Sequence, residues 1–165
     1  MEFAAGDAAA ALHLAEEARA GHEATQNRRS VANDLCNMAA YLIALDCFDD
    51  ARAYAREALA AVRDVQRTVL TAYVLQHLVA AAVLQSDSKH GRGAEADRNR
   101  AAMLLGFVDA WLTKLEAGRE YTERQEYERV IATLREAMGD DRLEKSMRLG
   151  AEWTEGVAVS AAFEL

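Results

Sequence analysis

The chain contains no proline, and glycine supplies only nine of its 165 residues. Proline and glycine are the residues that most often interrupt helices, so few positions in this sequence would stop one. Hydrophobic residues make up 52% of the chain, which is enough to bury a substantial core and argues against disorder. We therefore predict an all-α protein without a β-sheet.

Motifs for metal binding, redox chemistry and catalysis are also missing. The two cysteines, Cys36 and Cys47, have the spacing of neither a metal site nor a redox pair, so we expect reduced thiols in a cytoplasmic protein. The four histidines are scattered, with no His-Glu-x-x-His pattern. No glycine-rich phosphate loop and no nucleophile motif occurs. These absences predict a protein that is not an enzyme and has no cofactor or metal.

Basic charge and long apolar runs are scarce as well. The chain has 19 Lys and Arg against 27 Asp and Glu, a formal net charge of -8, which would repel a phosphate backbone. No uncharged apolar run approaches the roughly 20 residues of a bilayer span, and the N-terminus does not have the pattern of a secretory signal. We expect that the chain neither binds nucleic acid directly nor associates with a membrane.

What is present is helical periodicity, clearest between Arg28 and Arg63. Apolar residues there fall on two helical stripes, the first formed by Leu35, Met38, Ala39, Leu42 and Leu45 and the second by Ala51, Tyr54, Ala55, Ala58, Leu59 and Val62. Residues 46–50 form a turn in which Asp49 is placed to cap the second helix. The pattern predicts an antiparallel helical hairpin whose small residues, Ala51 and Ala58, let the helices approach closely.

The same pattern occurs once more, forty residues earlier. Ala11 matches Ala51 and Ala18 matches Ala58, which indicates an internal repeat. Residues 1–7 resemble the end of a helix and a turn, so the chain enters this repeat halfway. We predict one domain, 1–165, with these parts: a partial repeat at 1–24, a central hairpin at 25–64, a third hairpin at 65–117 with an inserted loop at 86–98, and C-terminal capping helices at 118–165.

The later helices are predicted from the same signals. Residues 66–85 are apolar around so much of the helix that it should be largely buried. A helix from about Asp97 closes the third hairpin, and Thr122-x-x-Gln125 offers a capping box for the next helix. Two short helices, from about Asp140 and about Thr154, would cover the end of the array.

The hairpin residues resemble the tetratricopeptide repeat. A small residue at Ala39, a turn, and then Phe48, Ala51 and Ala58 follow its pattern, although no closing proline occurs and the repeat is longer than the usual length of about 34 residues. The resemblance implies tetratricopeptide-like antiparallel hairpins stacked as a short right-handed solenoid with a C-terminal helical cap.

The C-terminal part resembles the closing segment of bacterial multidomain ATPases and related transcriptional regulators. The matching positions are Ala101, Ala102, Leu104, Leu105 and Gly106, then Tyr127, Glu128 and Arg129, then Leu134, Arg135 and Gly139. The resemblance implies a sensor or interaction role in signal transduction or transcriptional regulation. ATPase and DNA-binding parts would then lie elsewhere in the parent protein.

In tetratricopeptide hairpins the first helix of each pair lines the concave side, so we predict a partner-binding surface there. Its residues would be Asn33, Cys36, Asn37 and Ala40 on the central hairpin and Tyr73, Gln76 and His77 on the third. Two asparagines one turn apart could hold a peptide backbone. The simpler alternatives also stay open, namely asparagines that face water or cap neighbouring helices, and a His77 that is merely a satisfied buried histidine.

The sequence leaves two functions open, and they belong to different classes. The first is a non-catalytic scaffold that binds a protein, a peptide or other domains of the parent protein. The second is a structural homo-oligomerisation module without an external ligand, and hence a possible homodimer. Sedimentation separates the two, because assembly gives a tight symmetric dimer that buries the groove.

The hairpin register is testable with one pair of substitutions. Ala58→Arg should lower the free energy of unfolding by several kcal/mol, because it overpacks the helix pair and buries a charge. Arg56→Ala, two positions away, should cost roughly 0.5 kcal/mol or less. Thermal melts measure both, and equal effects would mean that the proposed register is wrong.

Overall fold

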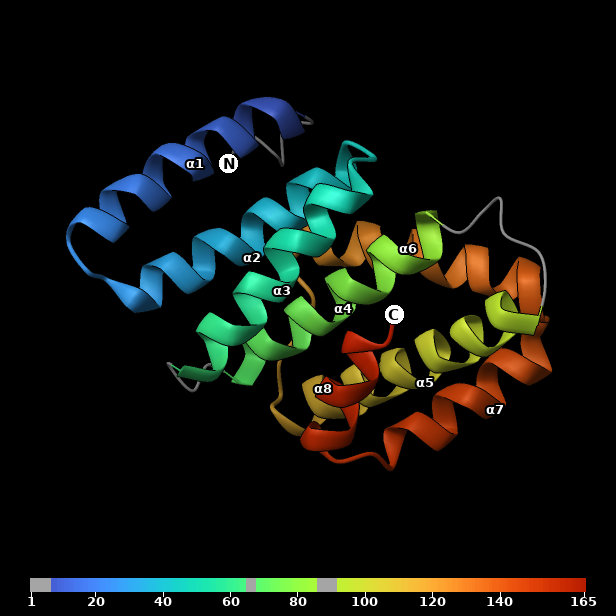
Figure 1. The fold of residues 1–165 in the computed structure, drawn as a ribbon. Helices are drawn as coiled ribbons and strands as arrows, with labels where there is room; N and C mark the ends of the chain where they lie inside the picture. Colours follow the sequence, from blue (N-terminus) through green and yellow to red (C-terminus); the bar gives the residue numbers. More distant parts are fainter. Residues whose placement is uncertain (1–6, 65–67, 86–91) are drawn as a thin grey trace.

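The computed structural model describes residues 7–64, 68–85 and 92–165, and this part of the chain is all-helical, with eight helices and no strand (Figure 1). The helices are α1 Ala8–Ala24, α2 Arg28–Ala44, α3 Phe48–Asp64, α4 Thr68–Gln85, α5 Arg92–Lys114, α6 Tyr121–Met138, α7 Asp140–Ala151 and α8 Glu155–Phe163. The all-α prediction is confirmed. None of the described helices combines the length and the apolar character that crossing a bilayer requires.

Helices α1 to α4 pack in chain order, each against the next, and α2 also contacts α4 (Figure 1). Within the predicted central hairpin, Ala51, Ala55 and Ala58 of α3 are fully buried. Small side chains at these positions bring α3 close to its neighbours, as the spacing of the alanines predicts. The counterpart of Ala58 in α1, Ala18, is exposed.

The same tight turn ends three helices of the described chain. Gln26, Asp46 and Glu116 each adopt a left-handed backbone conformation, with φ of 55°, 57° and 52°. In each turn the next residue's N–H donates to a carbonyl five residues earlier: Asn27 to His22 at 2.9 Å, Cys47 to Leu42 at 2.9 Å and Ala117 to Leu112 at 3.0 Å. This bond satisfies a carbonyl that the helix end would leave unpaired. None of the three residues is glycine, so sequence alone gives little sign of the turn.

Several predicted helix ends are wrong. Helix α3 begins at Phe48, so Asp49 lies inside its first turn, where it accepts a hydrogen bond from Gln85 at 2.7 Å instead of capping the helix. The predicted capping box at Thr122 does not form, because α6 begins one residue earlier and its N-cap, Glu120, makes no side-chain capping bond. The Asp49 carboxylate bonds to Gln85 of α4 in place of a local cap.

Two other boundaries differ from the prediction. Helix α5 begins at Arg92, so the second half of the predicted loop 86–98 is helical, as its alanines and Glu95 in the first turn favour. Helix α1 continues past Gly21 to Ala24. The first half of that loop, and the helix end predicted within residues 1–6, lie outside the described residues.

Helix α4 is the centre of the core. Every residue from Leu70 to Val83 is buried, as the apolar circumference of this segment predicts. It contacts α2 and α3 on one side, and α5, α6 and α8 on the others. Its polar residues Gln76 and His77 are fully buried, so they require hydrogen-bond partners inside the protein.

Helices α5 and α7 lie side by side and run in the same direction (Figure 1). At the start of both helices, Arg142 lies 2.6 Å from Glu95 and 3.2 Å from Asn99. Further along, the backbones touch at two glycines. A Cβ atom added to Gly106 would lie 1.9 Å from the Met147 carbonyl oxygen, and one added to Gly150 would lie 1.7 Å from that of Met103.

We expect Gly106→Ala and Gly150→Ala each to lower the free energy of unfolding by about 2 kcal/mol or more, because backbone atoms cannot move aside as a flexible side chain would. Gly156→Ala is the matched control. A Cβ atom there meets nothing within 4 Å, and alanine is the better helix former, so stability should hold or rise. Urea unfolding measures all three variants. Equal stability of the three variants would contradict the close crossing of α5 and α7.

Candidate functional site

The predicted partner-binding surface is largely covered by α6 of the same chain. Of its seven residues, Cys36, Ala40, Tyr73, Gln76 and His77 are at most 8% exposed, and only Asn33 and Asn37 are half-buried. Helix α6 contacts both α4 and α2 from this side. A peptide from outside therefore cannot reach Cys36, Tyr73, Gln76 or His77 in this structure. Sequence reasoning placed α6 in a terminal cap and missed this packing.

A line of hydrogen-bonding groups joins the covering helix α6 to the covered helices α2 and α4. The Sγ atom of Cys36 in α2 lies 3.5 Å from Nε2 of His77 in α4. The other ring nitrogen of His77, Nδ1, lies 2.8 Å from Oε2 of Glu126 in α6. Glu126 is 4% exposed and its second oxygen accepts a hydrogen bond from Gln76 at 3.0 Å. Glu126 of α6 is thus hydrogen-bonded to both Gln76 and His77 of α4.

The network continues into the connection between α5 and α6. Arg119 donates to Gln76 at 2.6 Å and also pairs with Asp109 of α5. Its guanidinium lies 3.8 Å from the centre of the Tyr127 ring, and the Tyr127 hydroxyl donates to Asp109 at 2.8 Å. Arg119 and Asp109 thus hold Tyr127 of α6 against α5.

Burial and neighbouring charges shift the pKa values of His77 and Cys36. Burial lowers the pKa of His77, but the charge of Glu126 and the contact with Cys36 outweigh burial, so the pKa lies well above the ordinary value of 6.5. When protonated, His77 donates to both neighbours, Cys36 and Glu126. Burial raises the pKa of the Cys36 thiol, which stays protonated.

The order of cysteine, histidine and carboxylate resembles a nucleophile with its base and orienting acid. Two observations argue against that chemistry in this structure. Cys36 is 1% exposed and His77 fully buried, so no substrate reaches them. A thiol with a raised pKa is also a poor nucleophile, since the thiolate is the reactive form. What the arrangement does is join α2, α4 and α6.

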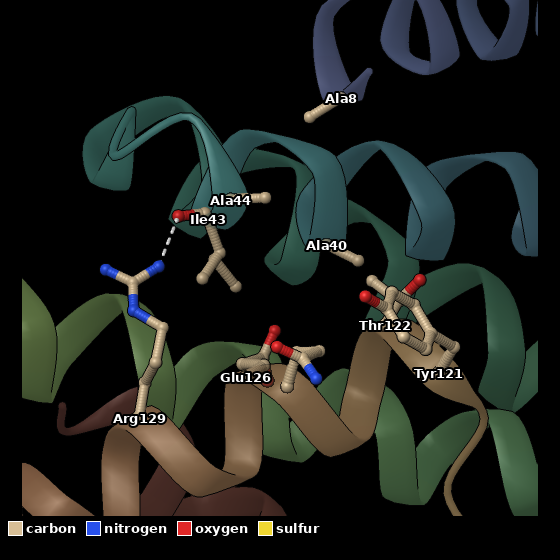
Figure 2. Close-up of a pocket in the computed structure, with 9 residues that line it drawn as sticks. Ala8, Ala40, Ile43, Ala44, Tyr121, Thr122, Glu126 and Arg129 are labelled. Carbon is tan, nitrogen blue, oxygen red and sulfur yellow. Dashed lines mark hydrogen bonds between the residues drawn. The ribbon is translucent and has the colours of Figure 1, made fainter. Parts of the chain in front are cut away.

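Beside this line, a groove of about 260 Å³ lies between α2 and α6. Figure 2 shows Ala40, Ile43 and Ala44 of α2 on one side, Tyr121, Thr122, Glu126 and Arg129 of α6 on the other, and Ala8 of α1 above them. Gln125 completes the lining.

One end of the groove is closed by Arg129, which donates to the Ile43 carbonyl at 3.4 Å and pairs with Asp46 at 2.8 Å. Towards the other end, Asn33 and Asn37 lie on the same face of α2 as Ala40 and Ala44, by the helical spacing. The two predicted asparagines therefore continue the α2 side of the groove.

Sequence reasoning missed the α6 residues of the site. One signal was present, because Glu123 and Glu126 share a helical face with Val130 and Leu134, and all four are buried. Carboxylates on an apolar stripe indicate partners in the interior. The described residues contain no group of three His, Cys, Asp or Glu side chains arranged to hold a metal ion.

The chain was compared with protein-family models, with curated proteins and with solved structures. None matches. The likeness to tetratricopeptide repeats and to ATPase-linked regulators therefore rests on the sequence pattern and stays a prediction.

The buried ion pair predicts how stability depends on pH. Below about 6.5 His77 is protonated in both states, and its contribution to stability is fully present. As the pH rises, the unfolded chain loses this proton first, so the free energy of unfolding should fall until the pH passes the raised folded pKa. Urea unfolding between pH 6 and 8.5 measures the slope.

His77→Gln should flatten this pH dependence, since glutamine can still donate to Glu126 but has no proton to lose in this range. His13→Gln is the control, because His13 is exposed on α1. The same slope in His77→Gln and the parent chain would show that the pair is not the cause.

Proposed function

We propose that this chain is a non-catalytic helical-repeat module that binds a protein or peptide. By the resemblance in its sequence, it would be the sensor or regulatory part of a larger signalling ATPase or transcriptional regulator. The observation that carries the proposal is the groove between α2 and α6, with Ala8 above it, which lies beside a buried network that fixes its walls.

A tetratricopeptide-like solenoid is part of this proposal. Its support is the packing of α1 to α4 in chain order, the contact between α2 and α4, and the identical turn at Gln26 and Asp46. These two turns lie twenty residues apart, at the ends of the successive helices α1 and α2. Helix α6 then lies against the side where the first helices of the pairs meet.

The chemistry of the groove suits a polypeptide. Alanine side chains on α2 leave room for the side chains of a partner, and the volume is large enough for one or two of them. The side chains of Asn33, Asn37 and Gln125 make no hydrogen bond to any residue that the structure describes. Amide side chains both donate and accept, which matches the N–H and C=O groups of an extended peptide backbone.

Homo-oligomerisation is the second candidate, and one observation favours it. Leu14 of α1 is 51% exposed at the outer edge of the helix stack, where a second copy could cover it. Sedimentation of the parent chain over a wide concentration range separates the candidates, because a stable monomer leaves the groove available.

A pair of matched variants tests peptide binding. Ala44 and Ala53 are both exposed helix residues, but only Ala44 lines the groove. We expect peptides selected from a random display library on the immobilised parent chain to bind Ala44→Trp about tenfold more weakly or worse, because the indole fills the groove. Binding to Ala53→Trp should not change. If no selected peptide prefers the parent chain over Ala44→Trp, this groove is not the binding site.

A further inference from the structure

A second hollow lies directly beyond the Arg129 end of the groove. It has a volume of about 550 Å³ and lies between the start of α3, the end of α4 and the second half of α6. Its lining residues are Asp46, Phe48, Leu84, Arg129, Ala132 and Thr133. Arg129 lines the groove as well, so the two spaces meet at this side chain. We call this space the second hollow.

The groove and the second hollow follow one face of α6. Their α6 residues succeed one another at the spacing of neighbours on a helical face: Thr122, Gln125, Glu126, Arg129, Ala132 and Thr133. Figure 2 shows the first part of this face, with Arg129 at one end. At 1.5 Å per residue, the face from Thr122 to Thr133 is roughly 16 Å long.

The opposite wall is continuous too. Ala44, near the end of α2, lines the groove, and Asp46, in the turn that follows, lines the second hollow. Phe48 at the start of α3 and Leu84 near the end of α4 complete this wall. Both side chains are half-buried, so each presents apolar surface to the second hollow. A partner that leaves the groove at Arg129 therefore meets a place for an apolar side chain.

Arg129 and Asp46 form the boundary between the two spaces, and they hold each other loosely. Their ion pair, at 2.8 Å, joins side chains that are 44% and 65% exposed. The bond from Arg129 to the Ile43 carbonyl is 3.4 Å long, beyond the usual range of about 2.7–3.2 Å. Because exposed ion pairs contribute little to stability, Arg129 can pair with another carboxylate at small cost.

We propose that the binding surface continues across Arg129 into the second hollow, and that its partner is an extended peptide with an acidic side chain between two aliphatic ones. This inference rests on the proposed function and specifies the partner. The acidic side chain pairs with Arg129, and the aliphatic side chains lie in the groove and in the second hollow. Among the described lining residues of both spaces, Arg129 is the one cation, while the carboxylate of Glu126 is already paired with His77.

The spacing of the three side chains follows from helix and strand geometry. Arg129 lies four residues after Gln125 and four before Thr133, which is about 6 Å along the helix in each direction. Side chains on one side of an extended peptide are two residues apart, or about 6.6 Å. Alternate peptide residues therefore reach the groove, Arg129 and the second hollow. A helical partner, at least about 10 Å wide, is too broad for a groove of about 260 Å³.

The test uses acetyl-Val-Ser-Glu-Ser-Leu-amide and three relatives. One has glutamine in place of glutamate, one has serine in place of leucine, and acetyl-Val-Glu-Ser-Ser-Leu-amide moves the carboxylate to the other side of the strand. Each is titrated into the full chain at about 0.15 M ionic strength, which screens the net charge of -8, and the Nε–H signal of Arg129 is followed by NMR. We expect the first peptide to bind about fivefold or more tightly than each relative.

Arg129→Gln should weaken the glutamate peptide about fivefold or more and leave the glutamine peptide unchanged. Losing an exposed ion pair should leave the fold intact, which a thermal melt verifies. Arg124→Gln is the matched control, because Arg124 is exposed on the same helix and lines neither space. It should bind both peptides as the parent chain does.

Asp46→Asn separates recognition from a structural role. It removes the carboxylate that competes for Arg129, and asparagine tolerates the left-handed backbone at this position, where φ is 57°. The glutamate peptide should therefore bind Asp46→Asn more tightly than the parent chain. The glutamine peptide should gain nothing.

The inference is overturned if the glutamate peptide does not bind, if the glutamine peptide binds equally well, or if Arg129→Gln leaves the affinity unchanged. It is also overturned if Asp46→Asn favours neither peptide over the other. The proposed function has a separate outcome. Library peptides that prefer the parent chain over Ala44→Trp but bind Arg129→Gln equally well would retain the groove as a binding site and reject its continuation past Arg129.

Discussion

The ion pair between His77 and Glu126 is the contact on which the arrangement of this protein depends. It lies in the interior, where α4 would otherwise carry an imidazole and the amide of Gln76 without partners. A buried pair adds little net stability, because desolvation offsets much of the attraction, but breaking one leaves an uncompensated charge. The pair therefore specifies where α6 docks more than it strengthens the fold.

The position of α6 determines the shape of the groove and the burial of the neighbouring residues of α2 and α4. It covers the side where α2 and α4 meet, and it forms the second wall of the groove next to Ala40 and Ala44. Arg119, held by Asp109 and Gln76, fixes the start of the helix. The same helix also brings Glu123 into the interior.

Much of the fold could be predicted from residue patterns, while the site could not. The apolar stripes and the alanines at 51 and 58 were sufficient for the central helices, because periodicity reports which face of a helix is buried. The same reasoning placed Cys36, Gln76 and His77 together on one side. It could not show that α6 covers them, since Glu123 and Glu126 read as surface charges until their partners are known. The cap predicted at Asp49 failed for the same reason, because its carboxylate bonds to Gln85, far away in the chain.

The sequence by itself determined that the chain is helical, where its helices lie to within a few residues, and which residues of the central hairpin are buried, with one exception. Leu45, placed on the first apolar stripe, is exposed. These properties depend on local propensity and on the period of 3.6 residues. Tertiary structure alone decided that α5 and α7 touch at Gly106 and Gly150, that α6 packs against α2 and α4, and that Glu123 is buried. Such properties depend on contacts between residues far apart in the chain, and no local pattern specifies which of several amphipathic faces will meet.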